Sequence, residues 1–141
     1  MKATPFADAF GVHLMLDGYL ADGNLLDADD HFTSVLAGLP ERLGMHKIAE
    51  PLVVRVGANN KKDPGGLSGF VMIAESHISF HSFPNRAFIS IDVYTCNTDV
   101  DLSTVTDCLV GAFGIKDFDT QIVGRGLRYP TSDIVRTSGE Q

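Results

Sequence analysis

The sequence predicts an α+β fold, in which two helices cover one face of a mostly antiparallel sheet as in a two-layer α/β sandwich. Three observations support this class: strand-like segments with alternating apolar residues, two segments with helical apolar periodicity, and an element order of β-α-β-β-β-α-β. With 141 residues, 44% of them apolar, the chain fits a single domain over 1–141 with a modest core.

The N-terminal part is expected to contain one strand and one helix. Apolar residues alternate with others over 11–17, which predicts a strand with one buried face. A turn over 22–24 leads to a helix over 28–39 with an apolar stripe, for which Asp27 is the expected N-cap. Pro40 is expected to end or kink this helix, because proline lacks the amide hydrogen that a helix interior uses.

The middle of the chain is expected to supply strands. A strand over 52–56 is followed by a polar, glycine-rich loop over 57–66. The next strand, over 69–75, is apolar on both faces, which predicts a central position in the sheet. A short extended piece over 78–83 ends at Pro84.

The C-terminal half is expected to form a strand over 87–95, a helix over 102–113 that ends at Gly114, and a last strand over 119–126. Because side chains alternate along a strand, the first of these divides into two faces, of which only the apolar one suits contact with helices. The apolar face holds Ala87, Ile89, Ile91 and Val93, and the polar face holds Ser90, Asp92, Tyr94 and Cys96.

One face of the predicted sheet is left without a helix. That face is polar but partly apolar, a combination that is typical of a surface that binds a partner or contains a site. We therefore expect a homodimer whose sheets meet near the functional surface.

Composition argues against several classes of function. The net charge of −7 comes from scattered acidic residues, without the basic cluster that nucleic-acid binding uses. No apolar run approaches the roughly 20 residues of a membrane helix and the N-terminus does not resemble a signal peptide, so we expect a soluble, cytoplasmic protein without a membrane partner. Cys96 and Cys108 lack the paired spacing of a structural zinc site, and Cys108 is expected to be a small core residue.

The segment 74–84 gathers two histidines, three serines and one acid at the end of a buried strand. It fits a hydrolase in which Ser76 or Cys96 is the nucleophile and His81 the base. It equally fits a metal site from His77, His81 and Cys96, or ordinary polar residues on a solvent-facing strand. Neither functional pattern is specific, because the segment has no glycine-flanked nucleophile elbow and no evident third triad member.

A set of motifs spread over the chain carries a family resemblance. They are Glu75-Ser76-His77-Ile78-Ser79, then His81, Pro84 and Ile91-Asp92-Val93-Tyr94-Thr95-Cys96, with Gly66-Leu67-Ser68-Gly69 and Gly11-Val12-His13-Leu14 upstream and Arg125-Gly126-Leu127 downstream. In order and spacing these motifs resemble the prokaryotic S-adenosylmethionine decarboxylases, a pyruvoyl-dependent family. The resemblance covers most of the domain.

The resemblance implies a proenzyme that cuts itself between Glu75 and Ser76. In this scheme the Ser76 hydroxyl attacks the preceding carbonyl and converts the peptide bond into an ester. Elimination then leaves a dehydroalanine, which water hydrolyses to a pyruvoyl group at position 76. The products are a β chain of residues 1–75 and an α chain of residues 76–141.

Further roles are implied by the same resemblance. His81 is the proton acceptor during processing, Ser68 assists processing by hydrogen bonding, and Cys96 is the proton donor in decarboxylation. The pyruvoyl group made from Ser76 forms a Schiff base with the substrate amine and accepts the electrons left by carbon dioxide, so neither pyridoxal phosphate nor a metal is needed. The product, decarboxylated S-adenosylmethionine, would serve spermidine biosynthesis.

The spacing of Ser76 and His81 predicts an irregular strand. The two residues are five positions apart and would point to opposite faces of a regular strand. Direct contact would require a turn or bulge just after Ser76, and we expect one there.

The residues expected to bind substrate depart from the family pattern. Relatives have an aromatic residue fourteen positions before the pyruvoyl serine and Trp-Pro-Glu after the histidine, where this chain has Lys62, Phe83, Pro84 and Asn85. Phe83 can still stack on a purine and Asn85 can hydrogen-bond a hydroxyl, so we expect both to bind substrate.

Two alternatives stay open beside the adenosyl substrate. A pyruvoyl-dependent arginine or ornithine decarboxylase on the same scaffold would need carboxylates for the basic side chain, and Asp17, Asp63 and Asp92 are candidates. An unprocessed, non-catalytic binding subunit would require that Ser76 stay a serine.

Overall fold

The chain folds into six strands and three α-helices within residues 6–59 and 64–135, which the computed structural model describes. In chain order the elements are β1 (Gly11–Tyr19), α1 (Gly23–Leu26), α2 (Asp29–Arg42), β2 (Leu52–Val56), β3 (Gly66–Ile73), β4 (Ser76–Phe83), the 3-10 turn η1 (Pro84–Arg86), β5 (Phe88–Thr95), α3 (Leu102–Phe113) and β6 (Asp117–Arg125). The short piece expected over 78–83 is a full strand, so four strands, and not three, separate α2 from α3.

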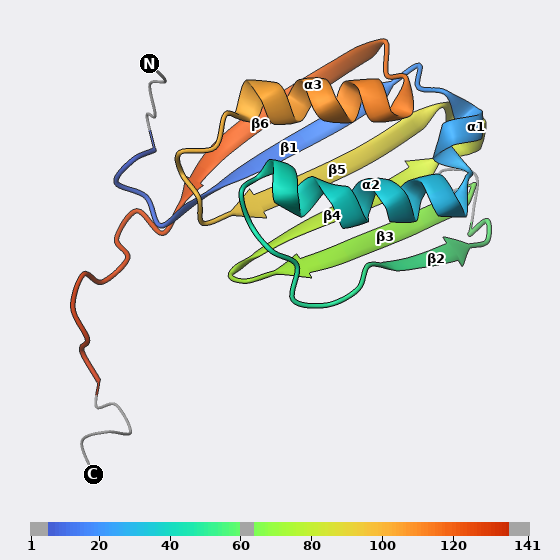
Figure 1. Cartoon of the computed structure of the whole chain (residues 1–141). Coiled ribbons are helices and arrows are strands. Elements are labelled where there is room, and N and C mark those ends of the chain that lie inside the picture. The colour runs from blue at the N-terminus through green and yellow to red at the C-terminus, as the bar shows by residue number, and fades with distance from the viewer. Residues whose placement is uncertain (1–5, 60–63, 136–141) are drawn as a thin grey trace.

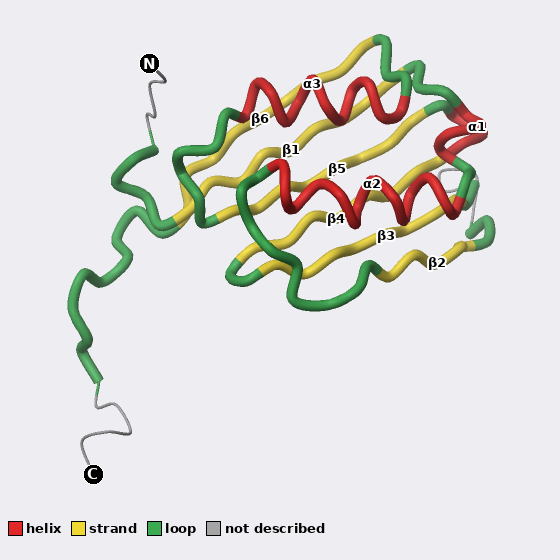
Figure 2. Tube along the Cα trace, in the orientation of Figure 1, coloured by secondary structure: helices red, strands yellow, loops and turns green. Residues whose placement is uncertain are grey.

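All six strands form one sheet in the order β2-β3-β4-β5-β1-β6, and each neighbouring pair is antiparallel. Helices α2 and α3 lie across the same face of this sheet (Figure 1), and the two layers separate clearly in the trace of Figure 2. The predicted fold class is confirmed. No helix in the described ranges is both long enough and apolar enough to cross a membrane.

Helix α2 differs from the expectation at both ends. Its N-cap is Ala28, which makes no side-chain cap hydrogen bond, whereas the Asp27 carboxylate accepts from Arg55 Nη1 at 2.6 Å. The Asp27 carboxylate therefore pairs with Arg55 of β2 instead of capping α2. Pro40 does not end the helix but lies in its last turn, where its ring is buried.

The core fills the space between the two helices and the sheet. Phe32 of α2, Phe80 of β4 and Phe113 of α3 meet edge to face at its centre, with ring centroids 5.3 to 5.6 Å apart. All three side chains are fully buried. This cluster joins both helices to the middle of the sheet and holds β4 in place.

Strand β3 is not the central, doubly buried strand that the sequence predicts. It lies second from the edge, and only its helix-facing residues are buried. Phe70 and Met72, on its other face, keep 38% and 44% of their surface exposed. The prediction was wrong because the uncovered side of the sheet carries apolar side chains of its own.

We call the uncovered side of the sheet the open face. The predicted division of β5 is confirmed, since its apolar residues from Ile89 to Val93 are buried under the helices and its polar residues are half-buried on the other side. Ala87 is outside the strand, in a left-handed conformation. Strand pairing and alternation give the open face a central group of side chains: His13, Met15 and Asp17, Ser68 and Phe70, His77, Ser79 and His81, and Ser90, Asp92 and Tyr94.

Candidate active site

The bond between Glu75 and Ser76 lies in the tight turn that joins β3 to β4. Ile73 pairs with Ser76, which leaves Ala74 and Glu75 as the only residues of the turn. Glu75 has a φ of 63°, a left-handed conformation that costs a residue other than glycine roughly 1–2 kcal/mol. The expected irregularity just after Ser76 is wrong: β4 pairs regularly from its first residue, and the turn precedes Ser76.

The Ser76 side chain points towards the helices and is only 5% exposed. Its Oγ accepts the backbone N–H of Cys96 at 3.1 Å. Its hydroxyl donates to Met45 Sδ at 3.8 Å, and the fully buried Thr95 hydroxyl donates to the same sulfur at 3.0 Å. Ser76 is therefore buried, and its hydroxyl has one donor and one weak acceptor.

Cys96 follows directly after β5 and lies beside the turn. His77 pairs with Tyr94, so the residues just beyond this pair on the two strands are also neighbours. The Cys96 thiol donates to Glu75 Oε1 at 3.7 Å. Three residues that the sequence singles out, Glu75, Ser76 and Cys96, are thus brought together at one end of the sheet.

The other two predicted processing residues form a separate pair. Ser68 and His81 are partners across β3 and β4, with 2.8 Å between Ser68 Oγ and His81 Nδ1, and both lie on the open face. His81 is five residues further along β4 than Ser76, about 16 Å at the usual rise of a strand, and its side chain points to the opposite side. Within one chain, His81 therefore does not reach Ser76.

The geometry of the described residues argues against the Ser76 hydrolase and against the metal site that the segment 74–84 suggested. A hydrolase with Ser76 as nucleophile and His81 as its base would need the two side chains in contact within the chain, and they are not. No group of three or more His, Cys, Asp or Glu side chains in the described ranges could hold a metal ion, so the site of His77, His81 and Cys96 is not formed.

A group that sequence reasoning missed surrounds His77 on the open face. The His77 ring stacks on Phe70, with centroids 5.9 Å apart, and lies 5.5 Å from the ring of Tyr94. The Arg125 guanidinium lies over the Tyr94 ring, 5.0 Å from its centroid. Burial lowers the pKa of His77, and the nearby His13 and Arg125 lower it further, against an opposing effect of Asp92.

A second missed contact joins His13 to Asp92. His13 Nε2 lies 2.8 Å from Asp92 Oδ1, between the neighbouring strands β1 and β5. Both side chains are half-buried. The alternation of side chains in β1 and β5 could have indicated that both residues lie on the same face of the sheet. The register that brings them together cannot be read from either strand alone.

The predicted substrate-binding residues lie at the other end of β4. Phe83 is half-buried, with its ring centroid 5.7 Å from that of Phe88, and Asn85 is exposed in η1. Asp17 and Asp92 line a shallow groove on the open face together with Asp119. Lys62 and Asp63 lie outside the described residues.

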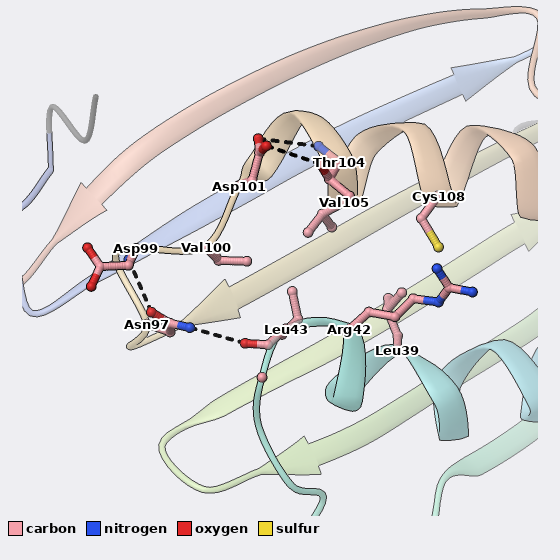
Figure 3. A pocket seen from close by; sticks show the side chains of 11 residues that line it. Leu39, Arg42, Leu43, Asn97, Asp99, Val100, Asp101, Thr104, Val105 and Cys108 are labelled. Atoms are coloured by element: carbon pink, nitrogen blue, oxygen red, sulfur yellow. Dashed lines mark hydrogen bonds between the residues drawn. The ribbon is translucent and has the colours of Figure 1, made fainter. Parts of the chain in front are cut away.

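A cavity of about 320 Å³ lies between the end of α2 and the start of α3 (Figure 3). It is lined by Leu39, Arg42, Leu43, Gly44, Asn97, Asp99, Val100, Asp101, Thr104, Val105 and Cys108. Cys108, expected to be a core residue, is instead half-buried and packs against the core. None of the residues with a predicted catalytic role lines this cavity.

Comparison with known proteins gives the family. The profile described as S-adenosylmethionine decarboxylase matches residues 12–126. A relative named S-adenosylmethionine decarboxylase proenzyme, from Aquifex aeolicus (strain VF5), is 28% identical over 121 residues, or 86% of this chain and 84% of the relative. A proenzyme of the same name from Shouchella clausii (strain KSM-K16) is 30% identical over 120 residues, or 85% of this chain and 88% of the relative.

A solved structure agrees with the fold. The crystal structure of the adenosylmethionine decarboxylase from Aquifex aeolicus matches 94% of this chain and 100% of its own, with a TM-score of 0.72 and 24% sequence identity. The matched region of the family profile includes Ser68, Glu75, Ser76, His81 and Cys96. This chain therefore belongs to the S-adenosylmethionine decarboxylases, a family of carboxy-lyases.

Proposed function

We propose that the chain cuts itself between Glu75 and Ser76 and decarboxylates S-adenosylmethionine with the pyruvoyl group that results. The observation that carries this proposal is the meeting of Glu75, Ser76 and Cys96 at the β3–β4 turn, within a chain of the decarboxylase family. The products of the cut would be residues 1–75 and 76–141. Spermidine biosynthesis fits the family as the use of the product, and a cytoplasmic location stays a prediction.

The contacts of Ser76 support the first step. Its Oγ attacks the carbonyl carbon of Glu75, the hydroxyl proton passes to the leaving nitrogen as the peptide C–N bond breaks, and an ester joins the two residues. The Cys96 N–H, 3.1 Å from Oγ, stabilises negative charge on Oγ as the hydroxyl loses its proton before the attack. The left-handed Glu75 raises the energy of the uncut turn, and cleavage relieves that cost.

Removal of the Ser76 α-proton is the next requirement, and we assign it to His81 of a second copy of the chain. The chain's own His81 is about 16 Å along β4 and on the other face. A homodimer formed through the open faces would bury the exposed apolar side chains of Leu52, Val54 and Phe70 and bring in a second Ser68–His81 pair. In that pair Ser68 fixes the ring of His81 through its hydrogen bond to Nδ1.

The surroundings of Ser76 fit a pyruvoyl group at that position, because the residue is buried, receives an N–H donor and follows Glu75, which contacts the Cys96 thiol. The group would supply the electron sink that a decarboxylation needs, without pyridoxal phosphate or a metal. Cys96 donates the proton that replaces carbon dioxide on the substrate, a task that suits a thiol held beside position 76.

Phe83 and Asn85 are the proposed contacts of the adenosyl group. An aromatic ring suits the purine and an amide suits a ribose hydroxyl. Both lie at the far end of β4 from Ser76, so in the proposed homodimer they would come from the same copy as His81. Arginine and ornithine are the competing substrates to be tested, because Asp17, Asp92 and Asp119 share a groove.

Denaturing mass spectrometry tests the proposal. The purified protein is incubated with S-adenosylmethionine, arginine or ornithine in separate reactions, with cyanoborohydride to trap a covalent adduct. We expect two chains that meet at the 75/76 boundary, and an adduct of decarboxylated S-adenosylmethionine on the 76–141 chain. The Ser76→Ala variant is the control and should stay at full length. A wild-type chain that stays intact would indicate a binding subunit instead, and an adduct only with arginine or ornithine would change the substrate.

A further inference from the structure

We propose that Met45 is a positioning residue for self-cleavage, a role that rests on the proposed function. Met45 follows α2 and is half-buried beside Ser76. Its Sδ is the acceptor of the Ser76 hydroxyl at 3.8 Å. The residue lies outside the segment that contains the cut and outside every motif that identifies the family in the sequence.

The backbone around Met45 is fixed at both ends. On the helix side, Met45 N–H donates to Pro40 O at 2.9 Å, and Asn97 Nδ2 donates to Leu43 O at 3.1 Å. On the other side, Lys47 forms a bridge to Ile73, the last residue of β3 before the turn. The segment that carries Met45 is thus tied to the last residue of β3, just before the turn, and to Asn97, just after Cys96, so its sulfur is held beside Ser76.

The thioether suits the hydroxyl of a nucleophile that must later lose its proton. Sulfur in a thioether is a weak acceptor, so it orients the hydroxyl without holding the hydrogen strongly. The Thr95 hydroxyl, 3.0 Å from the same sulfur, keeps the Met45 side chain in place. Together with the Cys96 N–H on the other side of Oγ, Met45 fixes the direction of the Ser76 hydroxyl.

The contact between Met45 and position 76 is no longer a hydrogen bond once the chain is cut. The Ser76 oxygen leaves with Glu75 as part of a carboxylate, and the Ser76 Cβ becomes a methyl group. A methyl group needs no acceptor and packs as well against a leucine as against a methionine. Met45 should therefore matter for the cutting step and matter little for the decarboxylation that follows.

The Met45→Leu variant separates these two steps. Precursor is made by cell-free synthesis and its cleavage is followed over time by intact mass. We expect cleavage about fivefold slower than in the wild type, because the Ser76 hydroxyl loses the acceptor that orients it towards the Glu75 carbonyl. Once fully cut, the variant should have kcat and KM for S-adenosylmethionine within about twofold of the wild type.

Met72→Leu is the matched control, because it makes the same chemical change on the open face of β3, where leucine keeps the apolar surface that the proposed homodimer would bury. It should be cut at the wild-type rate. A loss of packing at Met45 is measured by urea unfolding of Ser76→Ala with and without Met45→Leu, where the hydrogen bond is already absent and the two stabilities should agree.

The proposal is overturned if Met45→Leu is cut as fast as Met72→Leu, or if kcat falls as much as the rate of cutting. Either result leaves the proposed function intact, provided that the wild type is cut. A wild-type chain that stays at full length would instead refute the proposed function itself.

Discussion

Ser68 and His81 form a hydrogen-bonded pair across β3 and β4, on the opposite side of the sheet from the buried Ser76 side chain. If a second copy supplies His81, two inactive variants should rescue each other. We expect Ser76→Ala and His81→Ala chains each to stay intact alone. When they are mixed and allowed to exchange subunits, the His81→Ala chain should be cut, because its Ser76 meets the His81 of the other copy. Intact mass identifies which chain is cut, and a mixture without cleavage would contradict the assignment.

Cys96→Ala should separate processing from catalysis. The backbone N–H at residue 96 is retained, so the contact to Ser76 Oγ survives and the chain should still be cut. The proton donor is lost, and kcat for carbon dioxide release should fall by at least about 100-fold. Cys108→Ala, in α3, is the control and should keep the wild-type kcat. Equal kcat values for the two variants would remove Cys96 from the mechanism.

The backbone of Glu75 predicts a difference between two substitutions that both remove its carboxylate. Asparagine tolerates a left-handed conformation better than alanine does. In the Ser76→Ala background, Glu75→Asn should therefore be more stable than Glu75→Ala by about 0.5–1 kcal/mol. Urea unfolding measures this difference, and a more stable alanine variant would show that the turn does not carry the inferred strain.

His77 predicts a loss of stability in mild acid. Burial lowers the pKa of His77 in the folded chain below the ordinary value of about 6.5, so the unfolded chain binds the proton more readily. Its contribution is complete above about pH 6.5 and is lost as the pH falls through the lower, folded-state pKa. In the Ser76→Ala background, His77→Phe should retain the ring contacts and lose less stability than its parent between pH 7 and 5. Parallel urea curves at each pH test this, and an equal loss in both chains would exclude His77 as the cause.

Much of the fold could be predicted because the signals are local. The buried face can be predicted from an element's own sequence in β1 and β5, where apolar residues alternate, and in α3, which has an apolar stripe. The predictions that were wrong concern features that depend on residues far apart in the sequence. Asp27 binds Arg55 and so does not cap α2, and the apolar residues of β3 reach an uncovered face.

The candidate site divides in the same way. Glu75, Ser76 and Cys96 are brought together by the pairing of adjacent strands, which short-range pattern and resemblance could anticipate. The position of the turn before Ser76 depends on the register between β3 and β4. Met45 could not be found from the sequence, because only the packing of the segment after α2 brings its sulfur to the serine.

The strand order gives a cut at the β3–β4 turn an unusual topological result. The N-terminal product would contain β1, β2 and β3, and the C-terminal product would contain β4, β5 and β6. In the sheet, however, β1 lies between β5 and β6. Each fragment therefore fills gaps in the other, and neither keeps a continuous sheet alone. Once cut, the two fragments stay together through three strand pairs, β3 with β4, β1 with β5 and β1 with β6, and their unfolding becomes a dissociation that depends on concentration. Refolding would then require two partners to find each other, so the uncut chain is the form in which this interlocked sheet assembles most readily.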